Sequence, residues 1–239
     1  IGGVFLFALA RRMTSAGGAL VALAYYLLLP FGAQASRSFQ PDPGMVMWLI
    51  MAVYALYRWS EKLEWRWAIL SGIFTGMAIL TKPVAAYILA ATSLVLVIYL
   101  LGFKAALKNA QAWSMAFLMI LPSAIYYLGR SRGSIWDYIT NWTLSLSHLL
   151  VNPAFYMRWL SFVQDLMGFI ALLLALTGVL ISQKRNKVIL LGLWLGYALY
   201  GLSLPYQMYT HNYYHLQLIP ILALSLTSIA QVLMEQVVQ

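Results

Sequence analysis

The chain has 239 residues, of which 63% are hydrophobic and 9% are charged, and its mean hydropathy is +0.80. A water-soluble domain of this length cannot hide so much apolar surface, so the composition indicates a protein embedded in a lipid bilayer. The net charge of +9 is scattered in short clusters between apolar runs, which argues against a basic surface for nucleic acid. Cysteine is absent, which excludes disulfides and thiol chemistry.

Apolar runs of helical length follow one another along the chain. Because a spanning helix needs about 20 apolar residues, we predict an all-α polytopic membrane helix bundle, one transmembrane domain over residues 1–239 with about nine segments. The chain begins inside an apolar run, and we therefore interpret it as a fragment of a longer protein. The predicted segments are Ile1–Ala10, Gly18–Ala33, Gly44–Arg58, Ala68–Leu80, Val84–Phe103, Trp113–Leu128, Trp159–Ser182, Val188–Leu204 and Leu216–Met234.

The basic residues favour alternate loops. Ten of the 15 Lys and Arg residues lie at Arg11–Arg12, in the loop from Arg58 to Arg66, at Lys104 and Lys108, and at Lys184–Lys187. Positively charged loops remain in the cytoplasm, so the other side faces outward. That side holds all three histidines and Asp42, and we predict a multi-pass protein of the plasma (inner) membrane whose polar chemistry is extracytoplasmic.

Two predicted helices are short. Gly44–Arg58 and Ala68–Leu80 barely cross a hydrocarbon core of about 30 Å. The second ends in Thr81-Lys82-Pro83, which predicts a hairpin that stops below the outer surface and lines a polar cavity. Lys82 at this depth needs an anionic partner such as a lipid phosphate, or else extends to the headgroups.

The first candidate site surrounds Asp42. Pro41 and Pro43 flank this residue, which predicts an extended backbone that presents the carboxylate on a stiff turn. The alternative is that Asp42 caps the following helix. Arg37 is able to pair with Asp42 or to reach an anionic headgroup or phosphate.

The second candidate site is the segment from Tyr206 to His215, which is rich in Tyr, His, Asn and Gln. Such side chains supply hydrogen bonds and flat faces for a sugar or a phosphate, although an aromatic belt also explains the tyrosines. His211 and His215 would share a helical face, but without a matching Glu motif a metal site is disfavoured. The secondary candidates are Arg130 and Arg132, able to gather phosphate or merely solvated, and Asp165, either protonated, paired with Lys82 or Arg158, or facing a wet cavity.

Three motifs together resemble a known superfamily. Leu29–Asp42 reads Leu-Pro-Phe-Gly-x-x-x-Ser-Arg-x-x-x-Pro-Asp, Gly76–Pro83 reads Gly-Met-Ala-Ile-Leu-Thr-Lys-Pro, and Thr210–His215 reads Thr-His-Asn-Tyr-Tyr-His. In this order they resemble the second outward acidic segment, the Thr-Lys hairpin and the His-x-Tyr-Tyr segment of GT-C membrane glycosyltransferases. The resemblance is to the dolichyl-phosphate-mannose protein mannosyltransferase-like and aminoarabinose-transferase-like enzymes.

The resemblance implies an inverting, lipid-phosphate-sugar-dependent glycosyltransferase of the cell envelope. It implies a polyprenyl-phosphate-sugar donor and an acceptor lipid, glycan or protein on the outer face, with a possible divalent cation. It places the principal catalytic acid in a first outward loop, which we expect this chain to lack together with its N-terminal helices. Asp42 then matches the second acid, Lys82 with Tyr213 and Tyr214 is the phosphate end, and Arg37, His211 and His215 are further binding candidates.

Two alternatives remain open from the sequence. A transporter or lipid flippase also uses polar groups in a membrane bundle, but it favours groups near the midplane and a repeat between halves, neither of which is found here. A membrane scaffold with an aromatic rim would leave the motifs purely structural. The enzyme requires Asp42, Lys82 and the His211–His215 segment to converge on one outward site.

Overall fold

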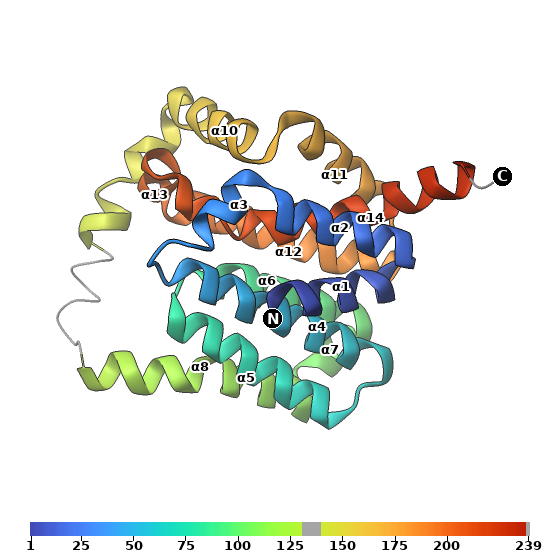
Figure 1. Cartoon of the computed structure of the whole chain (residues 1–239). Helices are drawn as coiled ribbons and strands as arrows, with labels where there is room; N and C mark the ends of the chain where they lie inside the picture. Colours follow the sequence, from blue (N-terminus) through green and yellow to red (C-terminus); the bar gives the residue numbers. More distant parts are fainter. Residues whose placement is uncertain (131–139, 238–239) are drawn as a thin grey trace.

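The computed structural model describes residues 1–130 and 140–237, and these residues form helices and turns without a β-strand. Figure 1 shows the helices lying side by side in a bundle, with the C-terminal end of α14 projecting from one end. The all-α fold class is confirmed for the described residues. The helices are α1 (Gly2–Met13), α2 (Ala16–Leu28), α3 (Pro30–Ala35), α4 (Asp42–Lys62), α5 (Trp65–Thr81), α6 (Ala85–Leu101), α7 (Phe103–Ala106), α8 (Ala110–Arg130), η1 (Thr140–Leu144), η2 (Ser147–Val151), α10 (Pro153–Met167), α11 (Phe169–Ile181), α12 (Lys184–Ser203), α13 (Pro205–Thr210), η3 (Asn212–His215) and α14 (Leu218–Val237).

Helices far apart in sequence pack closely because glycines remove side chains at the crossing points. In α12, a Cβ on Gly192 would lie 2.7 Å from the Thr92 Cα of α6. In α5, a Cβ on Gly76 would lie 2.6 Å from the Leu118 carbonyl oxygen of α8. Small residues allow such approach between membrane helices, where van der Waals packing drives association. These contacts join α6 to α12 and α5 to α8, while α14 packs against α2 and α11.

Each predicted segment coincides with helix, but several boundaries were wrong. The predicted Gly18–Ala33 helix is divided into two in the structure. α2 ends at Leu28 and Pro30 begins α3, because proline is tolerated only in the first turn of a helix. The predicted Trp159–Ser182 helix is broken at Gly168, whose φ of 85° is accessible to glycine, and α10 and α11 meet at 96°. The expectation that the Gly44–Arg58 helix is short is also wrong, since the matching helix, α4, contains 21 residues.

The predicted number of membrane spans is not confirmed. Among the described residues, one continuous stretch, Asn212–Gln236, is long and apolar enough to cross a bilayer by itself. The bent pair α10 and α11 adds a second if it counts as one span. The apolar helices Ala16–Leu28, Ala85–Leu101 and Ala110–Tyr126 are shorter.

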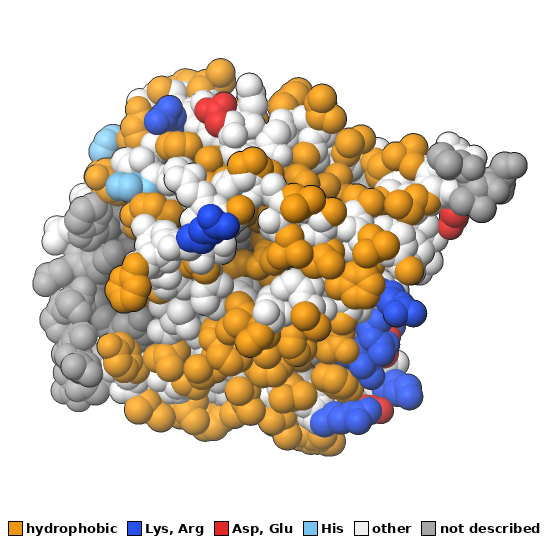
Figure 2. Space-filling model, in the orientation of Figure 1, with side chains coloured by type: hydrophobic (Ala, Val, Ile, Leu, Met, Phe, Trp, Pro, Cys, Tyr) orange, Lys and Arg blue, Asp and Glu red, His pale blue; other side chains and the backbone are white. Residues whose placement is uncertain are grey.

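The bundle has two chemically different ends. Figure 2 shows Lys and Arg gathered at one end and histidine at the other. We call the first the basic end, and it is built from the C-terminal ends of α1 and α4 and the first turn of α12, joined by the Arg12–Glu61 ion pair and an Asn186 Nδ2–H that donates to the Met13 carbonyl. The histidine end contains Asp42, Lys82 and the segment from Tyr206 to His215.

Candidate active site at the histidine end

Asp42 is the first residue of α4 and is almost completely buried, with 1% of its surface exposed. Its helical position corrects the prediction of an extended backbone, and Pro41, not Asp42, occupies the N-cap without a side-chain hydrogen bond. The capping alternative is therefore wrong as well. A carboxylate in the first turn is still favoured by the positive end of the helix dipole.

The partner of Asp42 is Lys82. Pro83 removes the backbone donor that would extend α5, so the helix ends at Thr81 and Lys82 adopts an extended backbone. The Lys82 side chain, 16% exposed, reaches back so that Nζ donates to Asp42 Oδ1 at 2.6 Å. Asp42 and Lys82 are 40 residues apart in the sequence, and their ion pair joins the start of α4 to the end of α5.

Two aromatic rings complete the surroundings of the ammonium group. Lys82 Nζ lies 4.5 Å from the ring centroid of Tyr214 and 5.3 Å from that of Tyr213. Cation–π contacts of this kind contribute about 2 kcal/mol when the cation is desolvated. An ammonium group has three N–H donors, and Asp42 uses one of them, which leaves donors able to bind an anion such as a phosphate oxygen.

His211 stands beside this group. It is exposed at the end of α13, and its ring lies 5.2 Å from Tyr213 and 5.8 Å from Tyr214 between centroids. Its Nδ1 lies 2.6 Å from the Thr210 hydroxyl. The structure therefore brings together Asp42, Lys82, Tyr213, Tyr214 and His211, each from a predicted candidate motif.

His215 occupies a different environment from His211. It is completely buried, and its Nδ1 lies 2.7 Å from the Tyr197 hydroxyl, which also accepts a hydrogen bond from Trp159 Nε1 at 2.9 Å. The ring of Phe162 lies 5.3 Å from the His215 ring. The predicted shared helical face of His211 and His215 is wrong, because His211 caps a 3₁₀ turn that ends with His215, and only His211 reaches solvent.

The remaining predicted residues lie apart from this group. Arg37 is exposed in the loop before α4 and does not pair with Asp42. Asp165 is exposed on α10 and accepts a hydrogen bond from the Ser161 hydroxyl at 3.3 Å, so of the three alternatives offered for it, pairing with Lys82 or Arg158 is not observed. Arg130 is the last residue of α8, and Arg132 lies outside the described residues.

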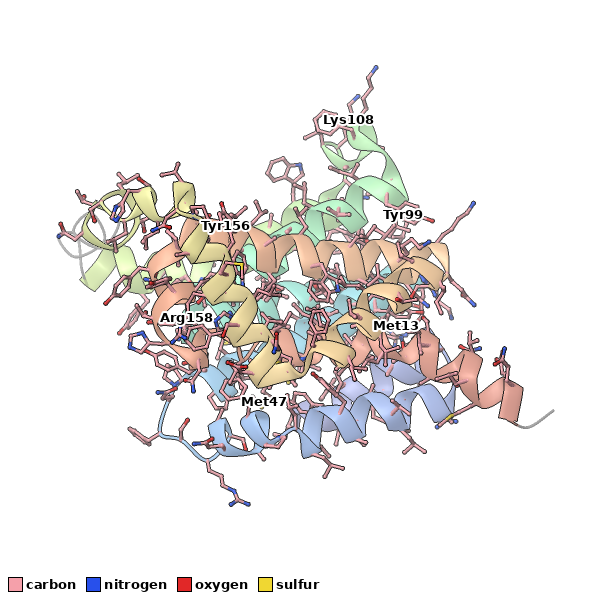
Figure 3. The ribbon with its side chains drawn as sticks, turned by 90° about the horizontal axis from the view of Figure 1, so that it is seen from above. Met13, Met47, Tyr99, Lys108, Tyr156 and Arg158 are labelled. Atoms are coloured by element: carbon pink, nitrogen blue, oxygen red, sulfur yellow. The ribbon has the colours of Figure 1, made fainter. Side chains whose placement is uncertain are left out.

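Sequence reasoning missed the polar groups behind the site. Trp159 and Tyr197 connect α10 to α12, and Gln217, 1% exposed, donates through Nε2 to the Tyr214 carbonyl at 2.6 Å. Trp159 follows Arg158, Tyr197 stands in an apolar run, and Gln217 lies two residues after His215, so only the proximity of Gln217 to the Tyr206–His215 segment was a signal in the sequence. Figure 3 shows α10, which carries Tyr156 and Arg158, crossing the direction of the neighbouring helices.

A large apolar cavity of about 640 Å³ lies between α6, α7 and α8. Its lining includes Ala86 and Tyr87 in the first turn of α6, shortly after Lys82, and continues to Phe103 and Trp113 near the basic end. The Tyr87 ring lies 6.1 Å from that of the buried Tyr200. The cavity is nearly devoid of polar lining, which suits a hydrocarbon chain better than a sugar.

The donors present do not form an evident metal site. Among residues 1–130 and 140–237, no group of three or more His, Asp and Glu side chains is arranged to hold a metal ion. Asp42 already has an ammonium partner. The possible divalent cation therefore enters no step proposed below.

These features define an apolar helical bundle with a buried ion pair beneath aromatic rings at one end. A family model described as dolichyl-phosphate-mannose-protein mannosyltransferase matches residues 1–128, more than half of the chain. The chain therefore belongs to this family of membrane glycosyltransferases. The match includes Asp42 and Lys82 but ends before the Tyr206–His215 segment, and it disfavours the transporter or flippase alternative. Neither the curated proteins nor the solved structures contain a match to this chain.

Proposed function

We propose that the protein transfers a sugar from a polyprenyl-phosphate carrier to an acceptor on the extracytoplasmic face, with inversion at the anomeric carbon. The observation that carries this proposal is the buried Asp42–Lys82 pair beneath Tyr213 and Tyr214. Asp42 uses one of the three N–H donors of Lys82, and the rings of Tyr213 and Tyr214 lie close to the same ammonium group. A phosphate oxygen and a sugar ring would use the remaining donors and the aromatic rings.

In the proposed reaction, the acceptor hydroxyl oxygen attacks the anomeric carbon from the face opposite the phosphate. The bond between that carbon and the phosphate oxygen breaks, its electron pair remains on the polyprenyl phosphate, and the hydroxyl proton passes to a carboxylate. Lys82 stabilises the charge that develops on the leaving phosphate. Asp42 is the second acid, which fixes the ammonium and assists acceptor binding, and the resemblance assigns the principal proton acceptor to a first outward loop.

The carrier chain has a suitable surface beside this site. The apolar cavity between α6 and α8 starts within the first turn of α6, directly after the Lys82–Pro83 corner. We place the phosphate at Lys82 and the first isoprene units along this cavity. Tyr213, Tyr214 and His211 then remain for the sugar, since flat rings and hydrogen-bonding groups suit its two faces.

Transfer from radiolabelled polyprenyl-phosphate sugars tests this assignment when it is measured in membranes that contain the full-length protein, with the first outward loop that we expect this chain to lack. We expect Lys82→Gln to lower the transfer rate by about 10²–10³-fold, because one preorganised donor to a developing negative charge contributes that much. Arg66→Gln, which removes an exposed cation at the basic end, is the matched control and should keep the wild-type rate. An unchanged rate for a folded Lys82→Gln or Asp42→Ala variant would remove that residue from the site.

The orientation in the membrane has a clean test because the chain has no cysteine. Single cysteines at the fully exposed Phe39 and at the exposed Lys62 mark the histidine end and the basic end, respectively. In intact cells, a membrane-impermeant maleimide should label Phe39→Cys and leave Lys62→Cys unlabelled. The opposite pattern would place the site on the cytoplasmic face and contradict the proposal.

A further inference from the structure

A cluster of cations at the basic end has no part in the proposed transfer. It consists of Arg11 and Arg12 from α1 and Lys184, Arg185 and Lys187 from α12, and we call it the Tyr57 patch because Tyr57 organises it. Tyr57 is 1% exposed and lies in α4. Its hydroxyl donates to the Arg12 carbonyl at 3.0 Å and accepts from Arg185 Nη2 at 3.0 Å.

Arg185 is held in place without a carboxylate. Its guanidinium carbon lies 4.7 Å from the centroid of the Tyr57 ring, so one aromatic side chain provides both a hydrogen bond and a cation–π contact. Asn186 fixes the same turn, since its Nδ2–H donates to the Met13 carbonyl at 2.6 Å. The guanidinium therefore has a defined position and retains N–H donors for a bidentate, charge-assisted contact with a phosphate.

The charge of the patch is not balanced locally. Glu61 pairs with Arg12 and Arg58, and in the described part of the chain no carboxylate pairs with Arg11, Lys184, Arg185 or Lys187. Three of these cations lie in the first turn of α12, where the helix dipole disfavours positive charge. Helix stability therefore does not account for them, and an external anion would.

The surroundings of the patch indicate what kind of anion it meets. α11 ends immediately before it, with Leu180 71% and Ile181 49% exposed. A phosphate group at the patch would thus have apolar side chains beside it for acyl chains. We propose that the Tyr57 patch binds the headgroup of an anionic phospholipid, with Arg185 contacting the phosphodiester and Lys184 and Lys187 flanking it. This inference is independent of sugar transfer.

The test measures the melting temperature of the intact protein in a neutral maltoside detergent as phosphatidylglycerol is added. We expect saturable stabilisation by phosphatidylglycerol and none by phosphatidylcholine, and a loss of apparent affinity of about fivefold for each cation removed. Arg185→Gln should show this loss, and Lys184→Gln with Lys187→Gln should show it without removing a side-chain hydrogen bond or ion pair among the described residues. Lys104→Gln with Lys108→Gln is the control and should bind normally, since Figure 3 shows Lys108 pointing away from the bundle and far from Met13.

Three outcomes would overturn the proposal. The first is equal stabilisation by phosphatidylcholine, which would show that the headgroup charge is irrelevant. The second is the same stabilisation by inorganic phosphate alone, which would identify a site for a free anion. The third is unchanged affinity in the Lys184→Gln, Lys187→Gln variant, which would place the lipid elsewhere.

Discussion

The two ends of the bundle treat charge in opposite ways. At the histidine end, one ion pair is buried, with side-chain exposures of 2% for Asp42 and 16% for Lys82. At the basic end the pairs are more accessible: Arg66 and Glu64 retain exposures of 65% and 32%, and the least exposed pair, Arg58 with Glu61, retains 20% and 22%. Exposed pairs contribute little because water and salt screen them, whereas a buried charge becomes costly once its partner is removed. The comparison teaches that the end with fewer charges depends more on each of them.

The largest effect is expected for Asp42→Ala, which strands the Lys82 ammonium in an apolar environment. The loss of stability should be about 3–5 kcal/mol, measured by thermal or denaturant unfolding in detergent. Lys82→Met added to Asp42→Ala should recover most of that stability, because the uncompensated charge is gone, yet the transfer rate should stay far below that of the wild type. A double variant as unstable as the single one would show that the comparison between the two ends does not rest on burial of charge.

A smaller effect is expected for Tyr197→Phe. The change removes the hydroxyl that joins Trp159 to His215 and leaves the buried His215 Nδ1 and the partly buried Trp159 Nε1 without their partner. We expect a loss of about 1–3 kcal/mol in the same unfolding measurement. Tyr156→Phe is the control, since Tyr156 is exposed and its hydroxyl donates only to the Leu150 carbonyl. An equal loss of stability in both variants would show that the Trp159–Tyr197–His215 hydrogen bonds have no special importance.

His211→Ala sharpens the comparison within the histidine end. The side chain is exposed and bonded only to the neighbouring Thr210, so stability should change by at most about 0.5 kcal/mol. Because its ring faces Tyr213 and Tyr214, the apparent KM for the sugar donor should rise in the transfer assay. Wild-type kinetics would exclude His211 from the substrate pocket.

The smallest effect is expected for Glu61→Gln at the basic end. This residue pairs with Arg12 at 3.2 Å and with Arg58 at 2.9 Å, but the groups are partly solvated. We expect a loss of about 0–1 kcal/mol that diminishes in high salt. A loss as large as that of Asp42→Ala would remove the contrast between the ends.

Much of the fold was predictable from the sequence because apolar runs must become helices in a bilayer, where the backbone has no other hydrogen-bond partner. The helix boundaries were less predictable. Gly168 interrupts a run that reads as one helix, and its break depends on how α10 packs across the α13 and η3 turns. Hydropathy does not encode such packing.

The candidate site shows the same division between local pattern and long-range contact. Asp42, Lys82, Tyr213 and Tyr214 were identified one motif at a time from their residue types. The sequence offered Arg37 as one partner for Asp42, but the partner is Lys82, because Arg37 is near in sequence whereas Lys82 is near in space.

The sequence by itself determined an apolar, all-helical chain, the separation of its basic loops from its histidines, and its membership of a membrane glycosyltransferase family. These properties follow from composition and local order, which a linear pattern records. Only the tertiary structure decided which carboxylate meets which cation, which histidine is buried, and that Tyr57 holds two arginines at the opposite end. Such choices depend on helix crossings set by glycines and side-chain shape over long sequence separations, and these are properties of the packed chain alone.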